Sequence, residues 1–245
     1  MPSINTNYGA AVALQSLNKT NAQLEMTQNR INTGMKVSSA KDNGAIFAIA
    51  TSQRANAASQ DAVRAGLQRT QSITDVALAA GDTITSALEE MKSLAVSIAS
   101  STADSDAEKA YLKDFNALGA EIASAITGAS FDSVNSLTGP LAGLSTLTGG
   151  SVDRTGASST AVDTAIGTVT GALATLGTQS KSLGRQITFV NKLQDALEAG
   201  VGNLVDADLA KESAKLTALQ TKQQLGVQAL SIANQGSSIL LGLFR

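Results

Sequence analysis

The side chains that could do chemistry in this 245-residue sequence are mainly carboxylates. The chain has no His and no Cys, so it lacks the commonest general base, thiolate nucleophiles and the usual zinc and copper ligand sets. Three carboxylate pairs remain as acid–base candidates: Asp104/Asp106, Glu89/Glu90 and Asp206/Asp208. They lie at expected helix starts or on expected exposed faces, where capping and the helix dipole explain acidic residues. We therefore expect no enzyme, no cofactor and no metal site.

The composition favours long helices over a compact core. Hydrophobic residues make up 43% of the chain, but aromatic residues only 3%, and there is no Trp. Such a composition is typical of bundles filled with Ala, Leu, Ile and Val. The net charge of −2 gives no electrostatic case for binding nucleic acid.

Neither a cleaved signal peptide nor a membrane span is expected from the sequence. The N-terminus lacks the basic start and apolar core of a signal peptide. The nearest approach to a membrane span is residues 223–244, which contain too many Gln and Ser to sit alone in lipid. We expect no membrane insertion.

The strongest structural signal is an apolar stripe in the second half of the chain. Its positions alternate between spacings of four and three, and ten of twelve are apolar: Val162, Ile166, Val169, Leu173, Leu176, Ser180, Leu183, Ile187, Val190, Gln194, Leu197 and Val201. This period of 3.5 residues predicts a coiled-coil helix, about 60 Å long at about 1.5 Å per residue. The chain is therefore expected to form a rod of long helices.

Other segments provide partners for this helix. A first helix carries a weaker apolar seam, at Leu14, Leu17, Asn21, Leu24, Gln28, Ile31 and Met35. A second helix spans residues 46–100, with an apolar face that includes Val63, Leu67 and Ile84. A third helix carries its apolar seam at Tyr111, Phe115, Leu118, Ile122 and Ala125. A last helix repeats Val205, Leu209, Leu216, Leu219, Leu230, Ala233 and Leu240 in one heptad register, interrupted by Glu212, Gln223, Gly226 and Ser237.

Two stretches break the helical period. Residues 32–45 contain Gly34, Asp42, Asn43 and Gly44, which form turns and caps. This stretch is either a connector or a surface that contacts a neighbouring subunit, and the sequence leaves both open. In residues 127–160, 19 of 34 residues are Gly, Ser or Thr; we expect a small β-hairpin region there, at the tip where the chain turns back.

The two ends of the chain share an unusual character. No charged residue precedes Lys19, and none lies between Lys222 and Arg245. Charge-poor amphipathic helices at opposite ends of the chain suit burial in an assembly.

Several ordered motifs resemble the bacterial flagellin family. These are INTN at 4–7, LNKTNAQLEMTQNRINTGMKVSSAKDNGA at 17–45, LEEMKSLAVSIAS at 88–100, and the C-terminal stretch from VDADLAKESAKL to SILLGLFR at 205–245. The resemblance covers roughly residues 1–125 and 162–245. Only about 35 residues lie between its two halves, where many flagellins carry large outer domains, so the chain resembles a minimal flagellin.

The resemblance implies a mainly α fold, a long antiparallel helical bundle or coiled-coil rod with a small β-hairpin region. Residues 1–40 and 205–245 would form a terminal inner-core domain, and residues 41–204 a helical rod domain with its hairpin tip at about 127–160. It further implies a self-assembling subunit of the extracellular flagellar filament, exported by the flagellar type III apparatus. Its partners would be copies of itself, the export apparatus, an export chaperone, the filament cap and hook-junction proteins.

Self-assembly would bury the apolar faces of the terminal helices. The expected polymerisation interface comprises Leu14, Leu17, Leu24, Ile31, Leu209, Leu216, Leu219, Leu230, Leu240, Phe244 and Arg245. For any single leucine, packing inside one molecule is an equally good explanation, so the expectation depends on the pair of segments. Two other hypotheses stay open: a hook–filament junction protein, and a secreted membrane-active helical protein that inserts residues 223–244.

One departure from the family yields a prediction. Many enterobacterial flagellins carry an arginine in the block aligned with residues 88–96, which the host Toll-like receptor for flagellin uses; this sequence has Glu89 and Glu90 there, and Ser93 where an acidic residue is usual. Because reversing charge at a recognition site weakens binding, we expect weak receptor activation. A reporter-cell assay that found the potency of an enterobacterial flagellin would contradict this.

Overall fold

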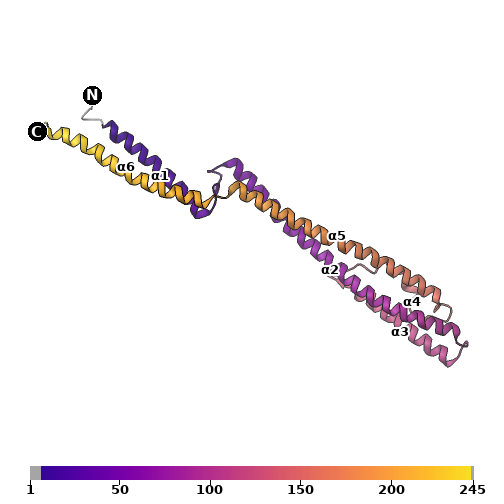
Figure 1. The fold of residues 1–245 in the computed structure, drawn as a ribbon. Helices are drawn as coiled ribbons and strands as arrows, with labels where there is room; N and C mark the ends of the chain where they lie inside the picture. Colours follow the sequence, from indigo (N-terminus) through magenta and orange to yellow (C-terminus); the bar gives the residue numbers. More distant parts are fainter. Residues whose placement is uncertain (1–6, 244–245) are drawn as a thin grey trace. The chain divides into compact units, whose positions relative to one another are not determined.

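A computed structural model describes residues 7–243, with side chains in the last helix described as far as Gln235. Its elements are α1 (Tyr8–Thr33), α2 (Gly44–Ser100), α3 (Asp106–Gly128), β1 (Ser130–Phe131), β2 (Val134–Asn135), the 3₁₀ turn η1 (Ala142–Leu144), α4 (Ser145–Thr148), α5 (Ser159–Val205) and α6 (Leu209–Leu243) (Figure 1). The predicted fold class, mainly α with antiparallel helices and one small β-hairpin, is confirmed.

Each long helix begins at a polar side chain that caps its free backbone N–H groups. The capping oxygens belong to Asn7 for α1, Asn43 for α2, Ser105 for α3, Ser158 for α5 and Asp208 for α6, at 3.0–3.3 Å from the capped nitrogens. Such a cap stabilises a helix by about 1 kcal/mol. The helix starts are thus fixed locally by the sequence.

The chain divides into two compact units. We call residues 59–193 the central unit, and the segments up to residue 58 and from residue 194 the terminal unit. Since α2 and α5 pass through both units, each helix contributes to two separate cores.

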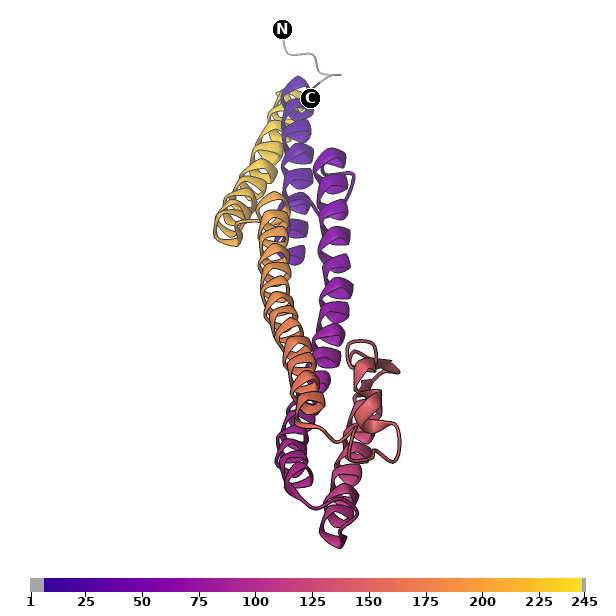
Figure 2. The ribbon, with the colours of Figure 1, turned by 90° about the vertical axis from the view of Figure 1, so that its right-hand side faces the viewer.

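In the central unit, α2 and α5 pack side by side and antiparallel (Figures 1 and 2). Lys92 pairs with Asp163 at 2.6 Å, and Gln71 donates to the Ser180 hydroxyl at 2.6 Å. The stripe predicted for α5 is confirmed, because all twelve positions are buried or half-buried. On α2 the predicted face is buried around Ile84, whereas Val63, near the edge of the unit, is 47% exposed.

Helix α3 adds a third layer to this core, through Phe115 and Ile122, both fully buried. The predicted position Tyr111 is instead 37% exposed. After α3, the chain forms the hairpin of β1 and β2, whose two-residue loop, Asp132–Ser133, has positive φ at both positions. This geometry matches the twist of the flanking strands.

The hairpin lies beside α2, where Asp132 pairs with Arg69. From there, residues 137–157 run back along α3 toward the turn between α2 and α3. The hairpin therefore lies near the C-terminal end of α3, and that turn lies at its N-terminal end. Along this return, leucines fill the core at Leu137, Leu141, Leu144 and Leu147.

An ion pair between the buried Glu108 and the partly exposed Arg154 closes the turn between α2 and α3. Arg154 donates to Glu108 Oε1 at 2.9 Å and to the carbonyls of Ala99 and Ser101, both at 3.1 Å. The second oxygen of Glu108 accepts from the Asp104 backbone N–H. Since Glu108 is 4% exposed, these hydrogen bonds compensate for the loss of its hydration.

The closest approach of the return segment to α3 occurs at Gly119. A Cβ on this residue would lie 2.5 Å from the Leu147 carbonyl oxygen. We expect Gly119→Ala to lower the free energy of unfolding by about 1–3 kcal/mol, since the backbone must shift. The matched change Gly167→Ala, on an exposed helix surface with nothing within 4 Å, should raise it by about 0.5–1 kcal/mol. Urea unfolding followed by circular dichroism measures both; equal effects would contradict the close contact.

Candidate assembly surface

In the terminal unit, α1 and α6 lie side by side as an antiparallel pair (Figure 1). Polar contacts recur along its length: Asn7 to the Ala233 carbonyl at 2.7 Å, Gln223 to Asn21 at 2.8 Å, and Arg30 to Glu212 at 3.2 Å. These directional contacts fix the register of one helix against the other.

The heptad register predicted for α6 matches its buried side. Leu219 and Glu212 are buried, and Leu216, Gln223, Gly226, Leu230 and Ala233 are half-buried. Gly226 faces Leu17 of α1. The exception is Leu209 in the first turn of α6, which is 49% exposed.

The seam of α1 differs from the predicted one. Its most buried residues are Thr20 and Thr27, flanked by the half-buried Leu17, Leu24 and Ile31. The predicted Leu14 is 48% exposed. Thr20 fits this seam because its hydroxyl donates within its own helix, to the Ser16 carbonyl at 2.9 Å. The buried Thr27 hydroxyl has no hydrogen-bond partner among the described residues.

A tight junction joins these helices to α2 and α5 within the terminal unit. Gly34 ends α1 with φ of 68°, in the left-handed region that favours glycine, and its carbonyl accepts from Ala207 N–H at 2.9 Å. Met35 and Asp206 form an antiparallel β-bridge. Below it, Val37, Ala50, Val201 and Val205 make a small apolar core. Residues 32–45 therefore connect two helices.

One carboxylate organises this connector. Asp42 Oδ2 accepts from the backbone N–H and the hydroxyl of Ser38, at 3.0 and 3.1 Å, and from the same two groups of Ser39, at 3.0 and 3.2 Å. These hydrogen bonds, with that from the Ser39 backbone the largest, lower the pKa of Asp42 below its ordinary value.

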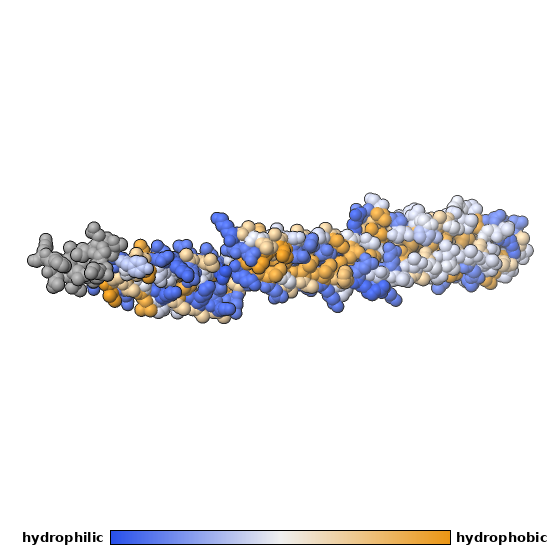
Figure 3. All heavy atoms as spheres, turned by 90° about the horizontal axis from the view of Figure 1, so that it is seen from above, coloured by the Kyte–Doolittle hydropathy of each residue, from blue (hydrophilic) through white to orange (hydrophobic). Residues whose placement is uncertain are grey.

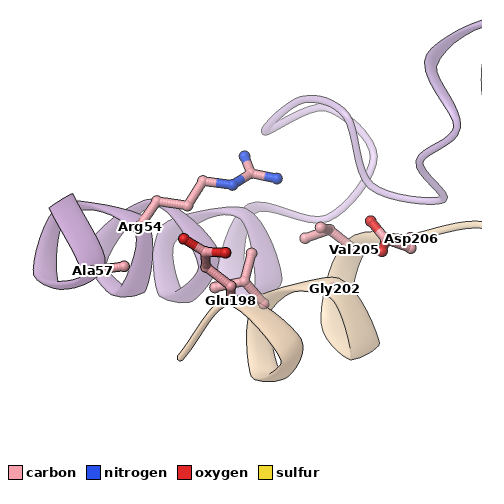
Figure 4. Close-up of a pocket in the computed structure, with 7 residues that line it drawn as sticks. Arg54, Ala57, Glu198, Gly202, Val205 and Asp206 are labelled. Atoms are coloured by element: carbon pink, nitrogen blue, oxygen red, sulfur yellow. The ribbon is translucent and has the colours of Figure 1, made fainter. Parts of the chain in front are cut away.

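Beside the junction lies a small cavity of about 230 Å³ (Figure 4). Its floor is apolar, formed by Ala57, Val201 and Val205, and the charged groups of Arg54, Glu198 and Asp206 surround it. Arg54 donates only to the Met35 sulfur, at 3.7 Å, and forms no ion pair within residues 7–243.

The α1–α6 pair exposes more apolar surface than the sequence reasoning identified. Besides Tyr8, Leu14 and Leu209, the side chains about half or more exposed are Val12, Met26, Leu225, Val227 and Ile232. Hydrophobic atoms reach the surface of these helices in Figure 3. These five residues lie outside the seams predicted from the sequence, which is why they were missed. For Val12, Leu225, Val227 and Ile232, the available signal was their position in the charge-free ends of the chain. Of the other predicted interface residues, Leu240 has no described side chain, and Phe244 and Arg245 lie outside the described residues.

The remaining candidates lie in the central unit or at the junction. Glu89, Glu90 and Ser93 are exposed on α2. Asp104 and Asp106 flank the start of α3, and Asp206 and Asp208 flank the start of α6, where Asp208 is the cap. Among residues 7–243, no group of three or more acidic side chains could hold a metal ion, and no described helix is long and apolar enough to cross a membrane.

A nearly all-helical chain whose two ends pair and still expose apolar side chains defines a structural protein that assembles with its own copies. The bacterial flagellin N-terminal helical region matches residues 4–142, and the C-terminal helical region matches residues 159–244. The chain therefore belongs to the bacterial flagellin family, with only residues 143–158 between its two conserved regions.

Relatives of similar length support this assignment. The chain is 52% identical to flagellin FljM and 51% identical to flagellin FljK of Caulobacter vibrioides, over 99% of this chain and 98% of each relative. It is 38% identical to a flagellin of Brucella melitensis over the full length of both. The protein is a minimal flagellin, a structural subunit of the flagellar filament, and neither the hook–filament junction protein nor the membrane-active protein is favoured.

The Asp42 cluster predicts a pH-dependent contribution to stability. Since the pKa of Asp42 is lowered in the folded protein, its contribution is present above the unfolded pKa and is lost as the pH falls through the folded pKa. Asp42→Ala should therefore lower the melting temperature at neutral pH, and the difference from the unchanged protein should shrink in acid, below the ordinary carboxylate range of about 4. Asp195→Ala, at an exposed site on α5, is the control. If the difference in melting temperature between Asp42→Ala and the unchanged protein is the same at every pH, the pH dependence does not come from Asp42.

Proposed function

We propose that the α1–α6 pair is the element through which this flagellin polymerises. The observation that carries the proposal is the set of apolar side chains exposed on both helices, above all Leu225, Val227 and Ile232. In the described terminal unit, two helices bury one side of each other and leave the opposite sides uncovered. Further copies of the chain would cover them.

The energies are sufficient for assembly. Moving a Val, Leu, Ile or Met side chain from full exposure to full burial yields about 1.5–3 kcal/mol. These side chains start about half exposed, so each gains a part of that range, and the sum over five or more residues per copy is several kcal/mol. Contacts between different surfaces of identical subunits need not close, and such contacts repeated without closure give an open helical filament.

Charge distribution supports an inner position for these helices. The sequence carries no charge before Lys19 and none between Lys222 and Arg245, as expected of surfaces that become buried. We therefore propose that residues 1–40 and 205–245 form the inner layer of the filament and residues 41–204 the outer layer. The leucines of the two seams, from Leu17 to Leu230, would hold α1 and α6 of one copy together. Leu14 and Leu209 would belong to the exposed apolar side chains that contact other copies.

The finer assignments follow from family membership. We infer that the chain leaves the cell through the flagellar type III apparatus with an export chaperone, and that it meets the filament cap and hook-junction proteins. The exposure of Glu89, Glu90 and Ser93 on α2 supports the expectation of weak receptor recognition, because these side chains are accessible in the monomer.

Point substitutions test the polymerisation surface without disturbing the monomer. The triple variant Leu225→Gln, Val227→Thr, Ile232→Gln should raise the critical concentration for filament growth more than about tenfold, since a loss of about 1.4 kcal/mol is enough for that factor. Sedimentation of seeded filaments measures the critical concentration. Val96→Thr, at a 56% exposed site in the central unit, is the matched control. If the triple variant has the same critical concentration as the unchanged protein, the proposal is overturned.

A further inference from the structure

A charged groove opens at the junction of the terminal unit. We call it the elbow groove; it has a volume of about 450 Å³, and its charged lining consists of Arg30, Lys36, Asp42, Asp206, Asp208, Lys211 and Glu212. It lies where α1 ends and α6 begins, so both terminal helices and their connector contribute to it.

The groove contains a buried carboxylate oxygen that lacks a hydrogen bond. Glu212 is 9% exposed, and its Oε1 accepts from Arg30 at 3.2 Å. Its Oε2 is buried and has no hydrogen-bond partner among the described residues. Lys215 Nζ forms an ion pair with this oxygen at 3.8 Å, which is beyond hydrogen-bonding distance. A buried charged acceptor left without a hydrogen-bond donor is energetically unfavourable.

The other carboxylates of the groove differ in how many hydrogen bonds and ion pairs their oxygens already form. One oxygen of Asp42, Oδ2, accepts four hydrogen bonds from Ser38 and Ser39, and one oxygen of Asp208 caps α6. Asp206 is exposed and forms no ion pair within residues 7–243. On the basic side, Arg30 is held by Glu212, and Lys36 donates to the Asn203 carbonyl at 3.2 Å. Asp206, Asp208 and Glu212 therefore retain acceptor capacity for an added cation.

Five lysines of the terminal unit form no ion pair among the described residues: Lys36 and Lys211 in the groove lining, Lys41 in the connector, and Lys19 and Lys222 farther along the helix pair. Lys19 on α1 and Lys222 on α6 are exposed. They lie at about the same level of the helix pair, because their neighbours Asn21 and Gln223 are hydrogen-bonded to each other. They are also the last cations before the charge-free ends of both helices.

Within one copy, Lys19 and Lys222 cannot reach the groove. Fourteen residues separate Lys222 from Asp208, which corresponds to about 20 Å along a helix. A second copy displaced by about this distance along the α1–α6 axis would bring its lysines level with the groove. The distance from Lys19 to the groove at the end of α1 is of the same order.

We propose that in the filament the elbow groove of one copy binds the ammonium groups of Lys19 and Lys222 of a second copy. The lysines would pair with Asp206 and Asp208 and supply the hydrogen-bond donor that Glu212 Oε2 lacks. This interaction sets the axial offset between copies, whereas the apolar faces supply most of the binding free energy. The inference rests on the proposed function, because it requires that the terminal helices of different copies lie side by side.

Zero-length coupling of amines to carboxylates tests the contact directly. Filaments grown from equal amounts of nitrogen-15-labelled and unlabelled chain are treated with a carbodiimide and digested, and mass spectrometry identifies linked peptides that carry both labels. We expect mixed-label links from Lys19 or Lys222 to Asp206 or Asp208, absent from the unassembled protein. Filaments whose mixed-label links join these lysines only to other carboxylates would overturn the inference and leave the polymerisation surface standing.

Charge reversal gives an independent readout. Lys222→Glu and Asp206→Lys should each raise the critical concentration about tenfold, the factor that about 1.4 kcal/mol produces, and the double variant should recover most of the loss. Lys109→Glu, at an exposed site near the start of α3, should have no such effect. Single variants that assemble normally, or a double variant no better than the singles, would contradict the inference. If the unchanged chain forms no filaments, the proposal that the α1–α6 pair polymerises is itself contradicted.

Discussion

The terminal unit depends on one constraint: a pair of helices can bury only the sides that face each other. In α1 and α6 those sides meet through Leu17, Leu219 and small residues such as Gly226. The other sides keep Val12, Met26, Leu225, Val227 and Ile232 in water. The monomer therefore leaves apolar surface exposed, which further copies would cover in the proposed assembly, whereas the central unit completes its core with a third helix and a returning segment.

Polar contacts within the seam reduce its stability but fix its register. Arg30 with Glu212 and Asn21 with Gln223 each require one alignment of α1 on α6, and a helix pair held only by leucines could slide by a heptad. Buried polar groups weaken such a seam, and among the described residues Thr27 and Glu212 each leave a buried oxygen without a hydrogen-bond donor or acceptor. A loosely held but correctly aligned pair is suited to a subunit that must become fully ordered in an assembly.

Much of this architecture was predictable from the sequence, because long helices repeat one pattern many times. The α5 stripe and the α6 register were correct on periodicity alone. The α1 seam was correct only in part: the predicted Leu17, Asn21, Leu24, Ile31 and Met35 are half-buried, but Leu14 and Gln28 are exposed, and the buried Thr20 and Thr27 were not predicted because they are polar. The Arg154–Glu108 ion pair joins residues that a loop brings together, and no periodicity reveals such contacts. The exposed Leu225, Val227 and Ile232 were missed because they lie outside the heptad positions.

The most direct test of the central claim is electron microscopy of seeded growth from the full chain beside a chain that lacks residues 1–35 and 215–245. The shortened chain keeps the whole central unit, whose folding circular dichroism can verify. We expect filaments from the full chain and none from the shortened one. Filaments from both would place polymerisation in the central unit and contradict the role assigned to α1 and α6.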